Sequence, residues 1–461
     1  MDKSKVKTFL LFVLIIISCF QTGELWFGNL SSRNFFYNLW AKNRSSIVKY
    51  SAEPIAFLQP TRIIINLGFE GGVYNVLNRS SEEFKLAQDE LGDILAQAFF
   101  EGQFLKEESI DWRKMLSQKS ILYTFTDPIP VSGIAGIENS LASYIPEFNQ
   151  ILVIPDKNIN QEINCYFINE KTNKVYIVAI KQDKLSMYNL INSVSENPTG
   201  MIYNSTKQIR MNQFENNVFL PIFNEFPTYQ LIGVKNSFIN EGKINEEKLD
   251  KMVNPLFINP TLKRMQKISD GTVFYIEGNV MVKYFPNGVM EYTNQTSSTS
   301  SVKTTFIESY QIAKEFLDEH QKVFNNYSSL ESYIYLSKKK ETDKGWEFYF
   351  DFIINDMPFI FSQEISEEIG MNHAIKIVVE NKKIKQYKRL TWEGYLLDEE
   401  KELNVSYLEA INSFNSAYNG EVNIKDMYWA YYLESLDKNP EINWIIDIGE
   451  DKYFIKATNE Q

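Results

Sequence analysis

The amino-acid sequence predicts an α+β protein in which a single N-terminal transmembrane helix precedes a multidomain extracytoplasmic region of helices packed on antiparallel sheets. Three observations lead to this prediction. One long apolar segment lies near the N-terminus, strand-like runs occur without regular alternation with helices, and a helix followed by strands occurs twice after residue 301. A doubly wound parallel sheet would require steady strand–helix alternation instead.

The apolar segment at residues 8–27 is predicted to anchor the chain in a membrane. Lys3, Lys5 and Lys7 precede it, and the run 9–17 is entirely apolar. As a helix the segment would be about 30 Å long, which is the thickness of a hydrocarbon core. Because positive residues stay on the cytoplasmic side, we expect a cytoplasmic N-terminus and an extracytoplasmic body in the cell membrane.

Two alternatives to a retained anchor remain open. Residues 16–19 resemble the end of a lipoprotein signal, which makes Cys19 a possible lipidation site. Ordinary signal cleavage needs small residues in an A-x-A-like pattern, but bulky residues 25–27 follow the candidate positions near Thr22. We therefore favour the retained anchor over both alternatives.

One face of the predicted anchor helix carries small and polar residues. Ser18, Gln21 and Thr22 lie three or four positions apart and so share a face. Such residues let membrane helices approach closely and form interhelical hydrogen bonds, each contributing roughly 0.6–2 kcal/mol. This face is a predicted helix–helix contact; alternatively, its residues only mark the outer end of the span.

Length, charge and cysteine content restrict the class of protein. For 461 residues roughly two to four domains are expected, because a single core does not grow this large. A net charge of −12 argues against a nucleic-acid partner, which needs a basic face. The only cysteine besides Cys19 is Cys165, so no disulfide framework is expected, and Cys165 is predicted to be a small buried strand residue.

Changes in sequence pattern suggest where the domains divide. The run 293–301 contains neither charged nor hydrophobic residues and is predicted to be a linker. The remaining predicted units are a cytoplasmic tip and anchor (1–27), an N-terminal α+β domain (28–155), a central mostly β domain (156–292), and two helix-plus-sheet repeats (302–400 and 401–461).

Apolar runs and turn residues predict the elements of the first half. A strand at 62–67 stops at Gly68, and a helix begins after Ser81 as its N-cap and ends before Gly102. A short helix is predicted at 110–117, and strands are predicted at 121–126, 151–154, 163–168 and 175–180.

The central part is predicted to be mostly β. Asn245 opens a short helix, and a hairpin joins 272–276 to 280–284 across Gly278. A further strand is expected at 289–292.

The repeat after the linker rests on two similar spacings. Helices are predicted at about 305–321 and 405–418, and each is followed by strands. Trp346 follows Tyr310 at almost the same distance as Trp444 follows Tyr407. We therefore expect helix-plus-antiparallel-sheet twice in this half.

Catalytic and metal-binding patterns are weak throughout the chain. The two histidines, His320 and His373, have no metal-type spacing, and no G-x-S-x-G elbow presents a nucleophile. His320 falls at the end of a predicted helix, where a positive charge suits the dipole. Residues 337–340 match S-x-x-K without the motifs that accompany it, and a calcium-like start at 156 lacks the required glycine and glutamate. We predict no enzyme, no cofactor and no metal site.

Three stretches in one order resemble a known family. They are LFINPTLKR at 256–264, DGTVFY at 270–275 and MVKYFPNGVMEY at 281–292. Together with the lysine-led anchor and the acidic body, they resemble the YycH family of membrane-anchored accessory regulators of the YycG (WalK) sensor kinase in Gram-positive bacteria. The resemblance is carried by residues 256–292 and by the overall layout of the chain.

The resemblance implies a non-enzymatic regulator of a two-component system, with an α+β fold in several domains. It implies two partners, a sensor histidine kinase of the YycG type that controls cell-wall turnover and a YycI-like accessory protein, contacted largely through membrane helices. No catalytic residues follow from it. The lipobox-like residues 16–19 depart from the plain anchor of the family. The alternative from another class is a lipid-anchored or secreted ligand-binding module whose aromatic strands form a pocket.

Overall fold

The computed structural model describes residues 58–459, apart from 69–71, 136–138, 156–161, 182–183, 197–200, 224, 237, 241–242, 297–303, 326–329, 331, 419–422, 437 and 450. The predicted anchor, with Ser18, Cys19, Gln21 and Thr22, therefore lies outside the described residues. No helix within the described ranges is both long and apolar enough to cross a membrane.

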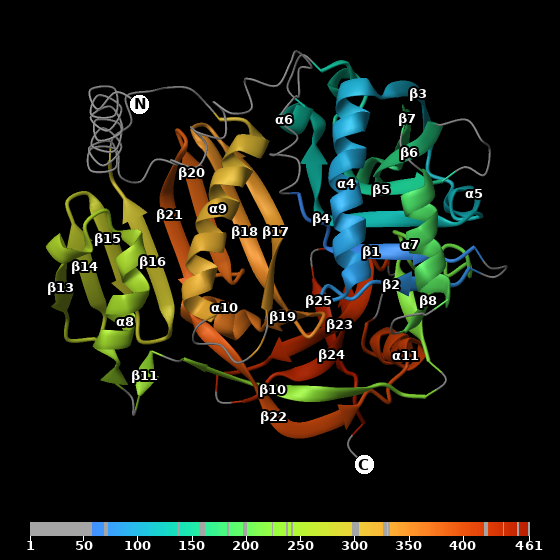
Figure 1. Cartoon of the computed structure of the whole chain (residues 1–461). Helices are drawn as coiled ribbons and strands as arrows, with labels where there is room; N and C mark the ends of the chain where they lie inside the picture. Colours follow the sequence, from blue (N-terminus) through green and yellow to red (C-terminus); the bar gives the residue numbers. More distant parts are fainter. Residues whose placement is uncertain are drawn as a thin grey trace, which may run out of the picture. The chain divides into compact units, whose positions relative to one another are not determined.

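The first part of the described chain forms a nine-stranded sheet whose paired strands are all antiparallel (Figure 1). In spatial order its strands are β3 (Gln103–Ser109), β7 (Lys174–Lys181), β6 (Glu162–Asn169), β5 (Glu147–Ile154), β4 (Ser120–Pro130), β1 (Arg62–Asn66), β2 (Tyr74–Val76), β8 (Ile202–Ser205) and β9 (Phe219–Ile222).

Helices α4 (Glu82–Glu101) and α7 (Lys184–Glu196) lie against one face of this sheet (Figure 1). The other face packs on α5 (Trp112–Met115). Alternation along β1 explains the two faces, because Ile63 and Ile65 belong to the main core whereas Ile64 packs in a separate cluster with Trp112.

Local signals place α4 where the sequence predicts it. The Ser81 hydroxyl oxygen accepts a hydrogen bond from the backbone N–H of Phe84 at 3.1 Å, as expected for an N-cap. One apolar face of the helix is buried, with Phe84, Leu91 and Ile94 among its residues, and the N–H of Gly102 closes the last turn on Ala98 O at 3.2 Å. The predicted helix at 110–117 is shorter, because regular helix begins only after Asp111, whose carboxylate caps Lys114 N at 3.2 Å.

The second large sheet has twelve strands, of which only β19 and β23 pair in parallel. In spatial order they are β13 (Arg264–Lys267), β14 (Val273–Glu277), β15 (Val280–Tyr284), β16 (Val289–Asn294), β21 (Lys383–Leu390), β20 (Ile375–Glu380), β18 (Gly345–Ile354), β19 (Met357–Phe361), β23 (Asp426–Leu433), β24 (Glu441–Asp447) and β25 (Lys452–Lys456), with β17 (Ser332–Thr342) paired to β18.

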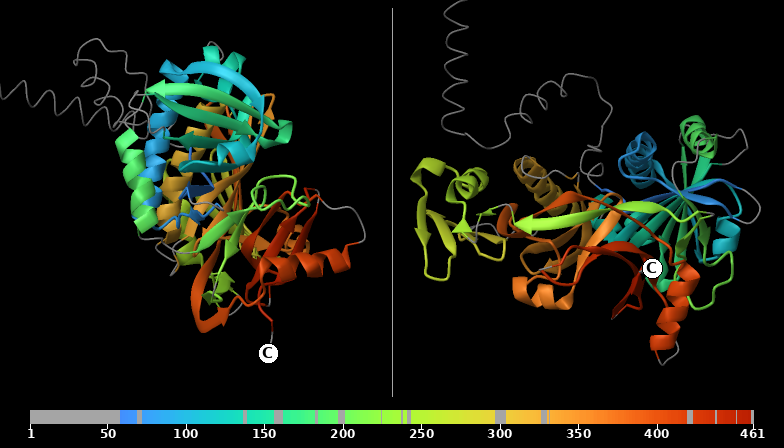
Figure 2. Two further views of the ribbon diagram at one scale, coloured as in Figure 1. Left: turned by 90° about the vertical axis from the view of Figure 1, so that its right-hand side faces the viewer. Right: turned by 90° about the horizontal axis from the view of Figure 1, so that it is seen from below.

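Four helices and a ribbon accompany this sheet. The helices are α8 (Glu246–Val253), α9 (Phe306–Asn325), α10 (Gln363–Ile369) and α11 (Tyr407–Ala417). The antiparallel ribbon of β10 (Thr228–Asn236) and β22 (Trp392–Glu402) runs alongside β23 (Figure 2), where the Tyr431 hydroxyl donates to Gln230 O at 3.0 Å. Shorter elements are α6 (Val131–Ala135), β11 (Ile239–Asn240), β12 (Lys243–Ile244), and the 3-10 turns at Ser140–Ser143, Glu170–Thr172, Asn254–Leu256 and Pro260–Leu262.

The expectation of an α+β fold with antiparallel sheets is confirmed. The hairpin predicted across Gly278 is β14–β15, and the glycine has a φ of 56° that most other residues avoid. A helix followed by antiparallel strands occurs twice after residue 303, as α9 with β17 and β18 and as α11 with β23–β25. All of these strands belong to one hydrogen-bonded sheet.

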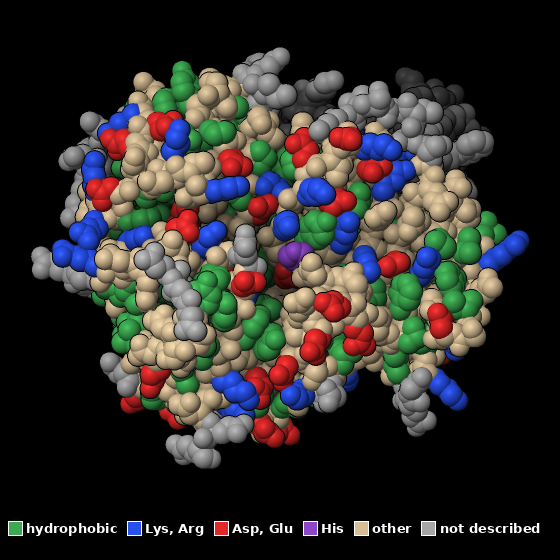
Figure 3. Space-filling view, turned by 180° about the vertical axis from the view of Figure 1, so that it is seen from behind, with side chains coloured by type: hydrophobic (Ala, Val, Ile, Leu, Met, Phe, Trp, Pro, Cys, Tyr) green, Lys and Arg blue, Asp and Glu red, His purple; other side chains and the backbone are tan. Residues whose placement is uncertain are grey.

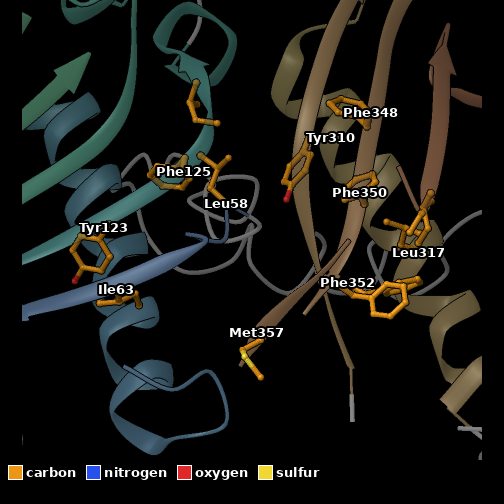
Figure 4. Close-up of a cluster of buried hydrophobic side chains, with 14 of the residues drawn as sticks. Leu58, Ile63, Tyr123, Phe125, Tyr310, Leu317, Phe348, Phe350, Phe352 and Met357 are labelled. Carbon is orange, nitrogen blue, oxygen red and sulfur yellow. The ribbon is translucent and has the colours of Figure 1, made fainter. Parts of the chain in front are cut away.

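One hydrophobic core extends across both sheets. In Figure 4, Leu58 and Phe125 lie on the side of the first sheet and Tyr310 and Phe350 on the side of the second. The position 155, where the sequence suggests a domain boundary, lies between β5 and β6, which pair with each other. The described part of the chain is thus held together across the sheets as well as within them.

Candidate functional site

An open cavity of about 420 Å³ lies beside the first sheet. Three segments border it: residues 110–113 at the start of α5, the turn between β6 and β7 with Glu170 and Asn173, and the connection 206–216 between β8 and β9. Six of the side chains that line it are ionisable, three acidic and three basic, namely Asp111, Glu170, Glu215, Arg113, Lys207 and Arg210.

Glu170 supplies a partly buried carboxylate to this cavity. Its Oε2 accepts hydrogen bonds from Gln150 Nε2 at 2.7 Å and from Asn149 Nδ2 at 3.2 Å. Its Oε1 accepts one from the backbone N–H of Asn217 at 3.2 Å. The carboxylate is therefore held in one position by donors from β5 and from the chain that enters β9.

Burial raises the pKa of Glu170 from 4.5 to about 7, and the negative charge of Asp426 contributes to the rise. The hydrogen bonds from Asn217 and Asn149, together with the positive charge of Lys207, lower the pKa without offsetting burial. The carboxyl group is consequently close to half protonated at neutral pH.

Local hydrogen bonds shape the β6–β7 turn that carries Glu170. Asn169 Oδ1 accepts from the N–H of Thr172 at 3.2 Å, and Asn173 ends the turn with a φ of 54°. Asparagine adopts this left-handed conformation more readily than most residues, so the sequence suits the turn.

Hydrogen bonds within the β8–β9 connection also fix its shape. The Ser205 hydroxyl donates to Asn217 Oδ1 at 2.5 Å, and Thr206 Oγ1 accepts from the N–H of Val218 at 2.9 Å. Lys207 Nζ donates to Phe214 O at 2.7 Å, across the connection. These bonds form the connection into a defined wall of the cavity.

Two cations of the cavity have no such internal role. Arg113 and Arg210 are both exposed, and neither forms an ion pair or side-chain hydrogen bond with any residue in the described part of the chain. Arg210 has a φ of 62°, which is unfavourable for a side chain of this kind. Lys207, in contrast, is partly buried. Burial lowers the pKa of its ammonium group, and the negative charges of Glu170 and Glu215 partly offset this lowering.

The same wall is bonded to the second large sheet. The N–H of Glu215 donates to Ile424 O at 2.8 Å, and the N–H of Ile424 donates to Gln213 O at 2.8 Å. Asn216 Nδ2 donates to Lys425 O at 3.1 Å, immediately before β23. The cavity therefore adjoins a hydrogen-bonded junction between the two sheets.

A serine, an aspartate and a histidine meet elsewhere, but not in catalytic order. Ser337 Oγ lies 2.5 Å from Asp351 Oδ2, and His373 Nδ1 lies 2.8 Å from the same oxygen. The aspartate thus lies between the other two, whereas a hydrolytic triad needs the histidine beside the serine. The other carboxylate oxygen of Asp351 accepts from the N–H of Ala374 at 2.8 Å, so the group joins β17, β18 and the entry to β20.

His320 differs from its expected role as a charged residue at a helix end. It is 3% exposed, and α9 continues beyond it to Asn325. Burial lowers its pKa from 6.5 to about 4, and its Nδ1 lies 2.7 Å from Phe316 O. The imidazole is therefore neutral at pH 7 and packs in the core.

The remaining candidates show no reactive arrangement. Cys165 is fully buried as predicted, and burial raises the pKa of its thiol. Within the described ranges no group of three or more His, Cys, Asp or Glu side chains could hold a metal ion. On the face shown in Figure 3, basic and acidic side chains are intermingled rather than gathered into a basic surface.

Sequence reasoning missed the cavity residues because no short motif connects them. Arg113, Glu170 and Arg210 come from three separate segments that only the sheet brings together. The positive φ of Arg210 distinguishes this residue from its neighbours, but this feature is visible only in the structure.

Comparisons with known proteins give one fold relationship. No protein-family profile matches the sequence, and no curated protein sequence matches it. The structure is similar to the crystal structure of YycH from Bacillus subtilis, with a TM-score of 0.51 and 15% sequence identity over 88% of this chain and 97% of that chain. The resemblance that residues 256–292 suggested is confirmed at the level of the fold: the chain has a YycH-like fold.

Proposed function

We propose that the chain is a non-enzymatic, membrane-anchored regulatory protein that modulates a sensor histidine kinase of the YycG (WalK) type. The observation that carries this proposal is the YycH-like fold, which extends over 88% of the chain and 97% of the compared YycH. The stretches at 256–292 that resemble the family include parts of the 3-10 turns at Asn254–Leu256 and Pro260–Leu262 and of strands β13–β16. These four strands form one contiguous edge of the second sheet. A YycI-like protein is the second proposed partner.

The proposed arrangement places the regulatory contacts partly in the membrane. The lysine-led segment 8–27 anchors the chain with its N-terminus in the cytoplasm. Ser18, Gln21 and Thr22 form the face that packs against helices of the kinase or of the YycI-like partner. The described body, on the outer side, supplies the extracytoplasmic contacts.

Replacing Ser18, Gln21 and Thr22 together with leucine tests the membrane contact. We expect the variant to reach the membrane normally but to recover less kinase and less YycI-like protein on co-purification, because the interhelical hydrogen bonds are lost. A matched control replaces Phe9, Val13 and Ile16, on the opposite face, with leucine and is expected to recover both partners fully. Unchanged recovery by the first variant would rule this face out.

A lipid-anchored or secreted ligand-binding module is the competing function. The cavity beside Glu170 favours ligand binding, although it is lined by polar loops. The aromatic side chains expected to form a pocket, such as Trp346, Phe348 and Trp444, are buried in the core. Metabolic labelling with a palmitate analogue, with and without Cys19→Ala, separates the two functions. Labelling that is lost in the Cys19→Ala variant would show that a lipid on Cys19, and not a retained helix, anchors the chain.

A further inference from the structure

We propose that the cavity bordered by Arg113, Glu170 and Arg210 binds a small zwitterion of the amino-acid or short-peptide class. Its carboxylate pairs with the two guanidinium groups, and its ammonium group pairs with the Glu170 carboxylate. This site does not depend on the proposed regulation of a kinase, because it is built entirely from the described body.

The size and lining of the cavity select small polar ligands. A volume of about 420 Å³ falls in the lower part of the range of ligand pockets, which is roughly 300–1,000 Å³. Apolar side chains in the lining are few, being Ile110, Trp112 and Met211. An apolar ligand would leave the charged groups of the cavity unpaired, whereas a ligand with charges of both signs would pair them.

The anionic end of the ligand is assigned to the two arginines. Guanidinium groups bind carboxylates through paired, nearly parallel hydrogen bonds, and Arg113 and Arg210 have no competing partner among the residues that the structure describes. Arg210 also occupies a left-handed position where glycine or asparagine would be less strained. Arg210 thus combines an unfavourable backbone conformation with a side chain that has no ion pair or side-chain hydrogen bond among the described residues.

The cationic end is assigned to Glu170. Three protein donors orient its carboxylate but provide no formal positive charge, and Lys207, whose charge acts on it, is itself bonded to Phe214 O. An ammonium group would supply the missing charge in a partly buried environment, where pairing is stronger than in water. The negative charge of Asp426 also acts on this carboxylate, and the other ionisable groups of the cavity lining are Asp111, Glu215, Arg113 and Arg210.

Ligand binding at this position would act on the junction between the sheets. The wall that carries Arg210 continues into Gln213 and Glu215, which exchange backbone hydrogen bonds with Ile424. Ile424 lies just before β23, the third strand from the β25 edge of the second sheet. A ligand that binds residues 206–216 would therefore also stabilise the connection to β23.

Isothermal titration calorimetry on the full chain in detergent tests the proposal. L-Alanine and L-alanyl-L-alanine are the probes, and they distinguish a single amino acid from a short peptide. N-acetyl-L-alanine lacks the ammonium group, and L-alaninamide lacks the carboxylate. We expect at least one zwitterion to bind and both single-charge analogues to bind at least about tenfold more weakly.

Variants assign the two ends of the ligand. Arg113→Gln and Arg210→Gln should each weaken zwitterion binding at least about tenfold, whereas Arg264→Gln, a matched exposed arginine on β13, should leave it unchanged. Glu170→Gln should remove the preference for the zwitterion over N-acetyl-L-alanine. Circular dichroism checks that each variant is folded.

Three results would overturn the proposal. They are no binding of either zwitterion up to about 10 mM, equal binding of the zwitterion and both single-charge analogues, and unchanged binding by the folded arginine variants. None of these outcomes bears on co-purification with a kinase, so failure here is distinguishable from failure of the proposed function.

Discussion

The backbone N–H of Arg79 donates a hydrogen bond to the Asp356 carboxylate at 2.7 Å, across the two large sheets. Asp356 lies in the two-residue turn between β18 and β19, where Asn355 and Asp356 have φ angles of 49° and 61°. Such a turn requires residues that accept left-handed conformations, and Asn and Asp do so more readily than others. Asp356 therefore forms both the hairpin and a link between the sheets.

We predict that Asp356→Ala destabilises the protein by roughly 2–3 kcal/mol, because it removes the hydrogen bond and places alanine at a positive φ. Asp356→Asn should cost less than about 1 kcal/mol, since its amide oxygen still accepts and the left-handed conformation is retained. Urea unfolding of the two variants measures the difference. Equal losses would show that the link to Arg79 contributes nothing.

Glu170 is expected to make stability fall as the pH rises. Its pKa is about 7 in the folded protein against an ordinary 4.5, so the folded state binds the proton more tightly. Below pH 4.5 Glu170 is protonated in both states and does not reduce the free energy of unfolding. Between pH 4.5 and 7 the free energy of unfolding falls by up to about 3 kcal/mol, because the buried group loses its proton. Glu170→Gln should remove this decline, as measured by urea unfolding at a series of pH values. A variant that is less stable than the parent at pH 8 would contradict the prediction.

His320 is expected to act in the opposite direction. Its pKa is about 4 in the folded protein against an ordinary 6.5, so the unfolded state takes up the proton first as the pH falls. Stability is full above pH 6.5 and decreases by up to about 3 kcal/mol towards pH 4. In His320→Phe the decline from Glu170 should appear alone, with stability highest at and below pH 4.5. An unchanged pH profile would show that the imidazole is not buried neutral.

Arg210 should show a conflict between stability and binding. Arg210→Gly relieves the strain of a positive φ, so stability should be equal or higher by up to about 1 kcal/mol, although glycine gains freedom in the unfolded chain. The same variant should lose zwitterion binding. Thermal unfolding and calorimetry measure the two effects, and a loss of stability above 1 kcal/mol would mean that the side chain supports the fold.

Elements with strong local signals were predicted well. Ser81 and Gly102 bound α4 as expected, and the β14–β15 hairpin forms across Gly278. Caps and tight turns are set by residues close in sequence, so a sequence alone can predict them. Asn245 likewise caps α8 through its side chain, which accepts from Lys248 N at 3.0 Å.

The pairing of strands that are distant in the sequence could not be predicted from such local signals. β19 pairs in parallel with β23, far along the chain, and β2 pairs with β8 although β3 to β7 lie between them in the sequence. These pairings follow from how whole faces bury their apolar side chains, and no short stretch encodes them. The domain boundaries, the anchor contact at Ser18, Gln21 and Thr22, and lipidation of Cys19 stay predictions.

The sequence by itself determined the α+β class, the positions of α4, α8, α9 and α11 and of the β14–β15 hairpin, and the resemblance to YycH that the fold confirms, but it did not indicate α7. Only the tertiary structure decided that Arg113, Glu170 and Arg210 border one cavity and that His320 is buried and neutral. The physical reason is the range of the interactions. Caps and turns act within a few residues, whereas burial, pKa and the lining of a cavity depend on every segment that packs nearby.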